Sequence, residues 1–102
     1  MKDEMLLSGL SAGADGGIGT TYNFQPKQIL RIYDCFLNGD IAGARVAQTK
    51  ANDAIEMVLR YGVLPSSKML INLSGIGYGT CREPFKALSE EAVRELAKMK
   101  VE

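Results

Sequence analysis

The chain has 102 residues, a length that predicts one domain. It has twelve basic and twelve acidic side chains and no histidine, so its balanced charge gives no basic surface for binding nucleic acid or an anionic membrane. No apolar run approaches the roughly 18 residues of a membrane-spanning helix, and Asp3 and Glu4 stand where a signal peptide would be positively charged. These features predict a soluble, cytoplasmic protein.

The first predicted element is a short helix from Asp3 to Ala12. Its apolar residues give it one broad hydrophobic side, and Gly13 is well placed to end it. Asp3 and Glu4 fall in the first turn, where the helix dipole favours acids. This acid pair has two interpretations, which the spacing alone leaves open: ordinary N-terminal helix acids, or a pair of acceptors for a polyhydroxylated ligand.

A glycine-rich stretch follows from Gly13 to Asn23, with the sequence GADGGIGTTYN. A P-loop would need Gly-Lys-Ser/Thr, but no lysine lies between Lys2 and Lys27, and the glycine spacing does not match the dinucleotide fingerprint. We predict a short strand from Asp15 to Tyr22, in which the glycines indicate close approach of backbone or ligand. A lone strand is not stable, and the chain offers no second convincing strand to pair with it.

The rest of the chain is predicted to be helical. Pro26 suits the first turn of a helix that stops at Asn38-Gly39, and Asp40 is the N-cap candidate of a long helix that ends at Gly62. The apolar face of the long helix is alanine-rich, which indicates close helix packing. The residues of that face are Ala44, Ala47, Ala51, Ile55, Val58 and Leu59.

A fourth helix opens at Pro65, with Met69, Leu70 and Leu73 predicted inside. Residues 74–80 carry alternate glycines and are predicted to be an irregular connection, and residues 81–85 an extended or turn-like segment before Pro84. Ser89 is the N-cap candidate of the last helix, and Leu88 and Val93 are spaced as a hydrophobic staple. This helix is predicted to turn Val93, Leu96 and Ala97 inward. The predicted fold class is therefore mainly α with one strand.

The two cysteines, Cys35 and Cys81, are far apart, and neither belongs to a CxxC motif. With no histidine in the chain, we expect no metal site, and no motif indicates a cofactor. We interpret both cysteines as buried or half-buried thiols. The alternative is a reactive thiol at Cys81, beside Arg82.

These motifs together resemble the N-acetylneuraminate lyases, which belong to the pyruvate-dependent class I aldolases that also include dihydrodipicolinate synthase. The stretch from Gly13 to Asn23 is similar to the last barrel strand of these enzymes, and the resemblance covers essentially the whole chain. The other matching motifs are Asp3-Glu4, Ser8-Gly9, Asn38-Gly39-Asp40 and Cys81-Arg82-x-Pro84-Phe85.

The resemblance implies a (β/α)8 barrel followed by C-terminal helices, of which this chain would be the C-terminal part. Residues 1–38 would be a remnant of the barrel (helix 7, strand 8 and helix 8), residues 39–102 the C-terminal helical region, and the two would form one compact unit. Such enzymes cleave sialic acid to N-acetylmannosamine and pyruvate through a lysine Schiff base. The resemblance implies that Asp3 and Glu4 accept hydrogen bonds from the glycerol-like tail of the sugar. Thr20, where many members have serine, would contact the same tail at the end of a barrel strand, where barrel active sites lie.

The family's Schiff-base lysine and its partner tyrosine lie on earlier strands and have no counterpart in these residues. Lys27, Lys50, Lys68 and Lys86 are predicted on helix surfaces or loops, without the desolvated setting that makes a lysine nucleophilic. We therefore expect no catalytic residue here.

Three hypotheses for the role of the chain follow. In the first, the chain is a C-terminal portion of an N-acetylneuraminate lyase that keeps sugar-binding residues but is inactive alone, with sialic acid and pyruvate as partners of the complete enzyme only. In the second, it is a non-catalytic helical oligomerisation or interaction module, because its orphan strand and exposed apolar surface favour a homo-oligomer. In the third, it completes a barrel with a separate chain.

Overall fold

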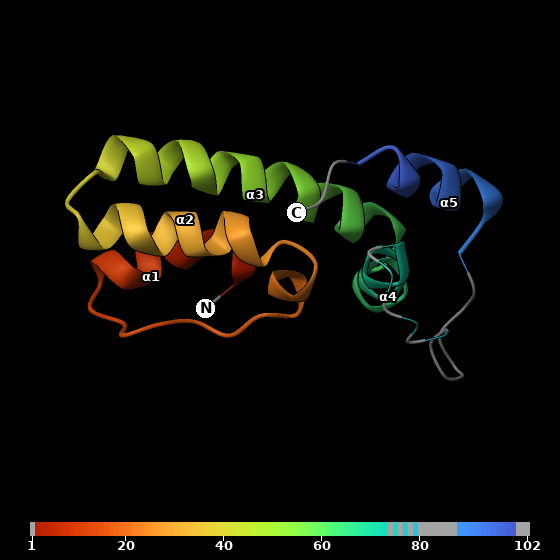
Figure 1. Ribbon diagram of the computed structural model, residues 1–102, viewed down its shortest axis with the longest axis horizontal. Helices are drawn as coiled ribbons and strands as arrows, with labels where there is room; N and C mark the ends of the chain where they lie inside the picture. Colours follow the sequence, from red (N-terminus) through yellow and green to blue (C-terminus); the bar gives the residue numbers. More distant parts are fainter. Residues whose placement is uncertain (1, 74, 76, 78, 80–87, 100–102) are drawn as a thin grey trace.

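A computed structural model describes residues 2–73, 75, 77, 79 and 88–99, and within these ranges the chain is mainly helical (Figure 1). The prediction of a mainly α chain is therefore confirmed. Two short 3-10 helices accompany five α-helices in the described ranges. The elements are η1 (Asp3–Met5), α1 (Leu6–Ser11), η2 (Thr20–Asn23), α2 (Pro26–Leu37), α3 (Ile41–Tyr61), α4 (Val63–Leu73) and α5 (Glu90–Ala97).

Helices α2 and α3 form an antiparallel hairpin whose turn follows the sequence signals (Figure 1). Gly39 has a φ of +75°, and the amides of Gly39 and Asp40 donate back to the carbonyls of Phe36 and Cys35 at 3.0 and 2.8 Å. This is a Schellman ending, for which glycine suits the left-handed residue. The predicted cap is also confirmed, because the Asp40 carboxylate accepts from the Gly43 amide at 2.9 Å and begins α3.

The predicted first helix is split into η1 and α1, and its end is confirmed. Gly13 has a φ of +108°, and the amides of Gly13 and Ala14 donate to the carbonyls of Leu10 and Gly9 at 3.1 and 3.0 Å. This second Schellman ending turns the chain out of the helix and into the extended stretch that follows.

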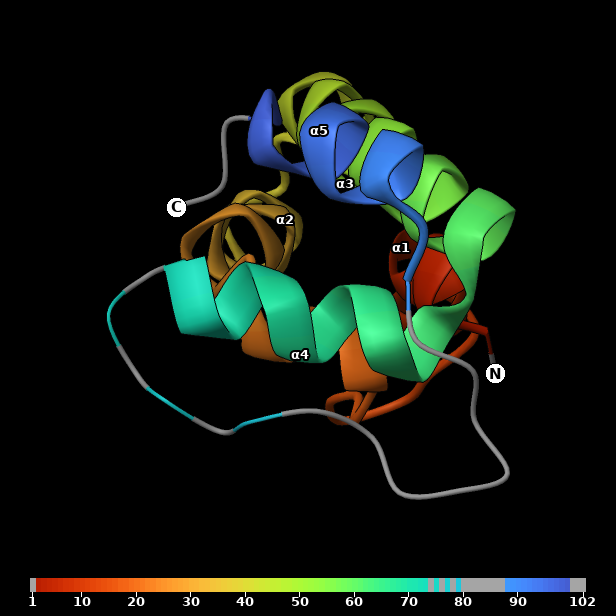
Figure 2. The same ribbon diagram turned by 90° about the vertical axis from the view of Figure 1, so that its right-hand side faces the viewer.

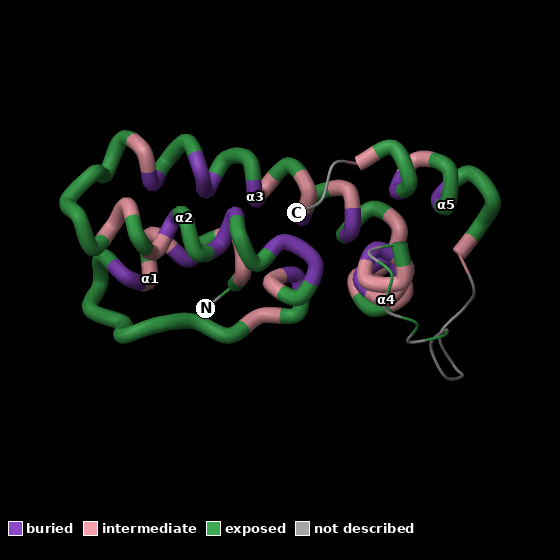
Figure 3. The backbone as a smooth tube through the Cα atoms, in the orientation of Figure 1, coloured by how far each residue is buried: buried purple, intermediate pink, exposed green. Residues whose placement is uncertain are grey.

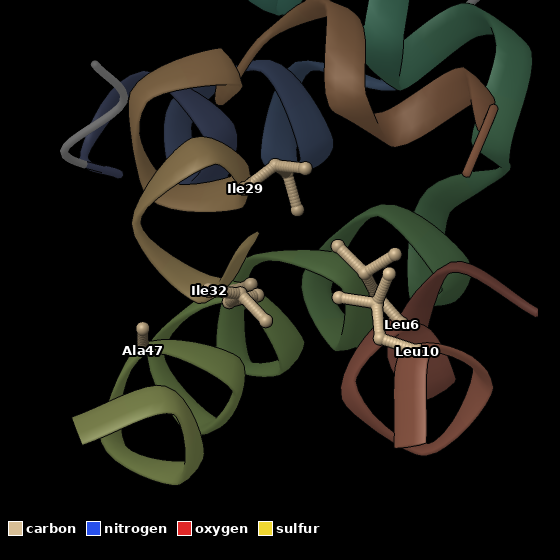
Figure 4. Packing of buried hydrophobic residues seen from close by; sticks show 6 residues of the cluster. Leu6, Leu10, Ile29, Ile32 and Ala47 are labelled. Carbon is tan, nitrogen blue, oxygen red and sulfur yellow. The ribbon is translucent and has the colours of Figure 1, made fainter. Parts of the chain in front are cut away.

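A first hydrophobic cluster joins α1 to the hairpin. Figure 4 shows that the side chains of α1 and α2 point toward one another and toward the alanine-rich face of α3. Ala44, Ala47 and Ala51 of α3 are at most 1% exposed, so they allow the close helix packing that the sequence indicates. The buried members of the cluster are Leu6, Leu10, Ile29, Ile32, Ala47 and Ala51.

A second cluster lies at the other end of α3, where α4 and α5 pack. Figure 2 shows that α4 starts where α3 ends and crosses the molecule on the side opposite α5. The buried members of this second cluster are Phe24, Val58, Leu70 and Leu96. The N-cap of α5 is confirmed, since the Ser89 hydroxyl oxygen accepts from the Ala92 amide at 3.1 Å.

Three apolar residues predicted to face inward, Leu73, Val93 and Ala97, are exposed, and these predictions were wrong. Leu59, predicted on the apolar face of α3, is exposed as well, and none of the four belongs to the second cluster. Helical periodicity identifies an apolar side of a helix, but the crossing of α4 and α5 decides which part of that side is covered.

The predicted strand from Asp15 to Tyr22 is absent from the described residues, and this prediction is corrected. Residues 16–18 run exposed along the molecule (Figure 3), and Gly19 is extended and half-buried. None of these residues has a ladder partner in the described ranges, and Thr20–Asn23 form η2. A strand is stable only when its backbone is paired, and none of the described ranges supplies a pairing segment. Local bonds form instead, from the Tyr22 amide to the Gly19 carbonyl at 3.2 Å and from the Asn23 side-chain amide to the Thr20 carbonyl at 3.0 Å.

Several predictions fall outside the described residues, including the connection around Ser74, Ile76, Tyr78 and Thr80 and the whole of residues 81–85 with Cys81. Within the described part of the chain, no helix is both long and apolar enough to cross a bilayer.

Candidate functional site

The Asp3 carboxylate is the centre of a small hydrogen-bonded unit. Its Oδ2 accepts from the backbone amide of Thr21 at 3.0 Å and from the hydroxyl of Thr21 at 2.6 Å. Thr21 is 3% exposed, so both of its donors need this acceptor. The carboxylate therefore ties η1 to η2 across 18 positions of sequence.

Gly19 is required by the close approach of this carboxylate. A β-carbon built on Gly19 would collide with the carboxylate oxygens and carbon of Asp3, which Thr21 holds in place. The expectation that strand-region glycines mark a close approach is met here, although the approaching group is a side chain of the same protein.

All three residues that the sequence singled out lie around one pocket of about 340 Å³. Asp3 and Glu4 come from η1 and Thr20 from the start of η2, while α3 and the start of α4 supply an apolar wall. The complete lining is Lys2, Asp3, Glu4, Thr20, Thr21, Ile55, Leu59 and Val63. The exposed Leu59 thus lies against this pocket.

The polar groups of the pocket differ in how far they are already engaged. Asp3 Oδ2 is used by Thr21, whereas within the described residues no hydrogen bond or ion pair reaches Asp3 Oδ1, the Glu4 carboxylate or the Thr20 hydroxyl. Glu4 is half-buried and Thr20 is exposed. The pocket therefore offers carboxylate acceptors and one hydroxyl beside an apolar wall, which is a combination suited to a polyhydroxylated molecule.

A second pocket of about 300 Å³ lies on the other side of Thr20, between η2 and α4. Its lining is Thr20, Asn23, Leu64, Ser67, Lys68 and Ile71. Ser67 is 3% exposed, and among the described residues its hydroxyl has no hydrogen-bond partner, as is also true of Ser66. Sequence reasoning missed Ser67, since two serines in a first helical turn are ordinary helix-start residues.

Tyr22 follows Thr21 and packs half-buried against the first cluster. Burial raises the pKa of its phenol above the ordinary value of 10.0, and the negative charge of Asp3 raises it further. Tyr22 is consequently neutral near pH 7 and cannot serve as an anionic base.

Lys2 lines the same pocket as Asp3 and Glu4, but among the described residues no ion pair joins it to either acid. Lys27 and Lys50 are exposed on α2 and α3, Lys68 is half-buried on α4, and Lys86 lies outside the described residues. Cys35 is a half-buried free thiol, as the sequence predicted. Among the described residues, no three Cys, Asp or Glu side chains lie close enough together to hold a metal ion.

Comparison with known proteins gives a consistent result. A model of the dihydrodipicolinate synthetase family matches residues 2–101. The chain is 42% identical to an N-acetylneuraminate lyase of Rhizobium meliloti over 88 residues, which are 86% of this chain and 29% of that protein. It is 39% identical to N-acetylneuraminate lyase 2 of Escherichia coli O6:H1 over 98 residues, 95% of this chain and 32% of that one.

Solved structures agree with these matches. The N-acetylneuraminate lyase of Fusobacterium nucleatum, complexed with pyruvate, superposes with a TM-score of 0.87 and 36% identity. The superposition covers 94% of this chain and 34% of that one. The chain spans about a third of the length of the curated relatives it matches.

Proposed function

Because the chain belongs to the dihydrodipicolinate synthetase family, we propose that it supplies the sugar-binding part of a Schiff-base aldolase that cleaves N-acetylneuraminate to N-acetylmannosamine and pyruvate. The observation that carries this proposal is the single pocket lined by Asp3, Glu4 and Thr20. The lyase names of the similar proteins support the choice of sugar, and their TIM-barrel fold supports a barrel context for residues 1–38.

Each polar group has a distinct proposed role toward the glycerol-like tail of the sugar. The Glu4 carboxylate accepts hydrogen bonds from two tail hydroxyls, because charged acceptors form the stronger hydrogen bonds. Thr20 donates to or accepts from a third oxygen, and Asp3 Oδ1 remains an acceptor while Oδ2 holds Thr21. Ile55 and Val63 cover the C–H faces of the tail.

The chemistry of carbon–carbon cleavage is proposed to lie outside these residues. A Schiff-base lysine must be desolvated to be a good nucleophile, and Lys27 and Lys50 are exposed. We therefore propose that the chain by itself is inactive.

Titration of the ¹⁵N-labelled chain with N-acetylneuraminate tests the proposal. We expect the amides of Glu4, Thr20 and Thr21 to shift, with a Kd on the order of 1–10 mM for so small a contact. Glu4→Gln should weaken binding about tenfold, because a neutral acceptor replaces a charged one. The matched control is Asp53→Asn, an exposed acid on α3.

Two results would contradict the proposal. The first is equal binding of an analogue whose glycerol tail has been removed, because the tail is the group that the pocket recognises. The second concerns inactivity: pyruvate followed by borohydride should leave the mass of the chain unchanged, and a trapped adduct on one lysine would refute it.

A second role, self-association, is favoured by Ile18, which is 99% exposed in the unpaired extended stretch. Such an edge is a template for pairing with another chain, here a second copy. We expect light scattering to show a dimer or larger oligomer that Ile18→Lys converts to monomer, because a lysine on the edge opposes pairing. A wild-type chain that stays monomeric at about 1 mM would exclude this role.

A further inference from the structure

We propose that Gln48 and Asn52 of α3 are positioning residues that hold the Asp3–Glu4 pair in place for ligand binding. This inference rests on the proposed function for its ligand, but its structural part can be tested without one. Neither residue lines the pocket, and both act through the backbone of η1 and α1.

The contacts form a short relay from α3 to the acid pair. Gln48 Oε1 accepts from the Leu7 amide at 2.9 Å, and Gln48 Nε2 donates to Asn52 Oδ1 at 2.8 Å. Asn52 Nδ2 then donates to the carbonyl oxygen of Glu4 at 3.2 Å. Gln48 is 8% exposed and Asn52 is half-buried, so these bonds are partly shielded from competing water.

Local sequence leaves the start of this helical segment without a cap. The residues at the two cap positions, Lys2 and Met5, make no side-chain cap hydrogen bond. The first amides of a helix have no partner inside the helix, and Leu7 is the second residue of α1. Gln48 therefore does from 41 positions away what an N-cap side chain usually does locally.

One side of α3 both holds the backbone of η1 and α1 and lines the pocket. Gln48, Asn52, Ile55 and Leu59 follow at spacings of three or four residues, so they share a helix face. The first two bind the backbone of η1 and α1, and the last two line the pocket. The acid pair is thus held from two directions, with the Glu4 backbone fixed by α3 and the Asp3 carboxylate fixed by Thr21.

The test compares Gln48→Leu and Asn52→Leu with a control on the same helix. Thr49→Val removes an exposed hydroxyl that donates only within α3, to the Arg45 carbonyl at 2.9 Å. We expect Asn52→Leu to weaken N-acetylneuraminate binding about tenfold, as loss of supporting contacts does at other sites, while Thr49→Val leaves it unchanged. Leu96→Val, which loosens the second cluster, serves as a destabilised control that should also bind normally.

Measurements without ligand separate positioning from general stability. Gln48→Leu should lose hydrogen-exchange protection at the Leu7 amide about tenfold or more, and Gln48→Glu should keep it because the acceptor remains. Asn52→Leu should shift the amide signals of Glu4 and Thr21, whereas Leu96→Val should not.

The outcomes distinguish the two proposals. If the wild-type chain does not bind the sugar, the proposed function fails, and the exchange and shift data alone decide the positioning role. If Asn52→Leu lowers the melting temperature but changes neither the Glu4 and Thr21 signals nor the affinity of a chain that binds, the positioning role is overturned.

Discussion

Ile32→Ala should lower the free energy of unfolding by about 3–4 kcal/mol, the largest stability effect that we expect from a single apolar truncation. Ile32 is 0% exposed and lies where α1, α2 and α3 meet (Figure 4). Truncation of a buried isoleucine to alanine typically costs about 2–5 kcal/mol, from lost burial and from the cavity that remains. The total free energy of unfolding of a native domain is about 5–15 kcal/mol, so the variant would be only marginally stable.

Urea unfolding followed by circular dichroism measures this effect. Leu30→Ala is the matched control, because Leu30 is on the same helix but 58% exposed, and it should change the stability by less than about 1 kcal/mol. A loss below about 1 kcal/mol for Ile32→Ala as well would show that α1 does not pack on the hairpin in solution.

Asp3→Ala should lower the free energy of unfolding by about 2–4 kcal/mol, although Asp3 is only half-buried. The substitution removes the acceptor of two Thr21 donors, and each hydrogen bond to a charged group contributes about 1.5–3 kcal/mol before the neighbouring structure relaxes. Asp15→Ala, which removes an exposed acid of the extended stretch, is the control and should be nearly neutral. Unfolding in urea again provides the measurement.

A double-mutant cycle with Thr21→Val tests whether Asp3 acts through Thr21. Thr21→Val removes the hydroxyl donor but keeps the amide donor, so we expect a coupling energy of about 1–2 kcal/mol. Strict additivity of the two substitutions would show that the side-chain hydrogen bond does not form in solution.

The titration of Tyr22 reports on the same carboxylate. Burial, and then the charge of Asp3, raise the pKa of Tyr22 above 10.0, so the folded state keeps its phenol proton where the unfolded state has lost it. The stabilisation is present below pH about 10 and is lost as the pH rises through the raised pKa. Asp3→Asn should lower the pKa of Tyr22 without returning it to 10.0, because burial remains, and an NMR titration of the ring would show the change.

The candidate site was partly predictable from sequence. The resemblance of Asp3, Glu4 and Thr20 to a known sugar-binding set singled them out, and the structure brings all three to one pocket, while their contact with sugar stays a prediction. Sequence reasoning did not find that the neighbouring Thr21 is the buried partner of Asp3. That one-residue difference depends on η2, which turns Thr21 inward and leaves Thr20 exposed.

Local sequence signals set several of the helix boundaries, although α4 begins at Val63 and not at the predicted Pro65. Gly13, Gly39, Asp40 and Ser89 act through hydrogen bonds that span only a few residues, so no distant partner is needed for these signals to operate. Contacts between distant segments, by contrast, set which apolar faces are covered and place Gln48 as the cap of a helix 41 positions away. They also leave the glycine stretch without a strand partner in the described ranges. These features depend on contacts between distant segments, and helical periodicity and local propensity carry no information about which segments will meet.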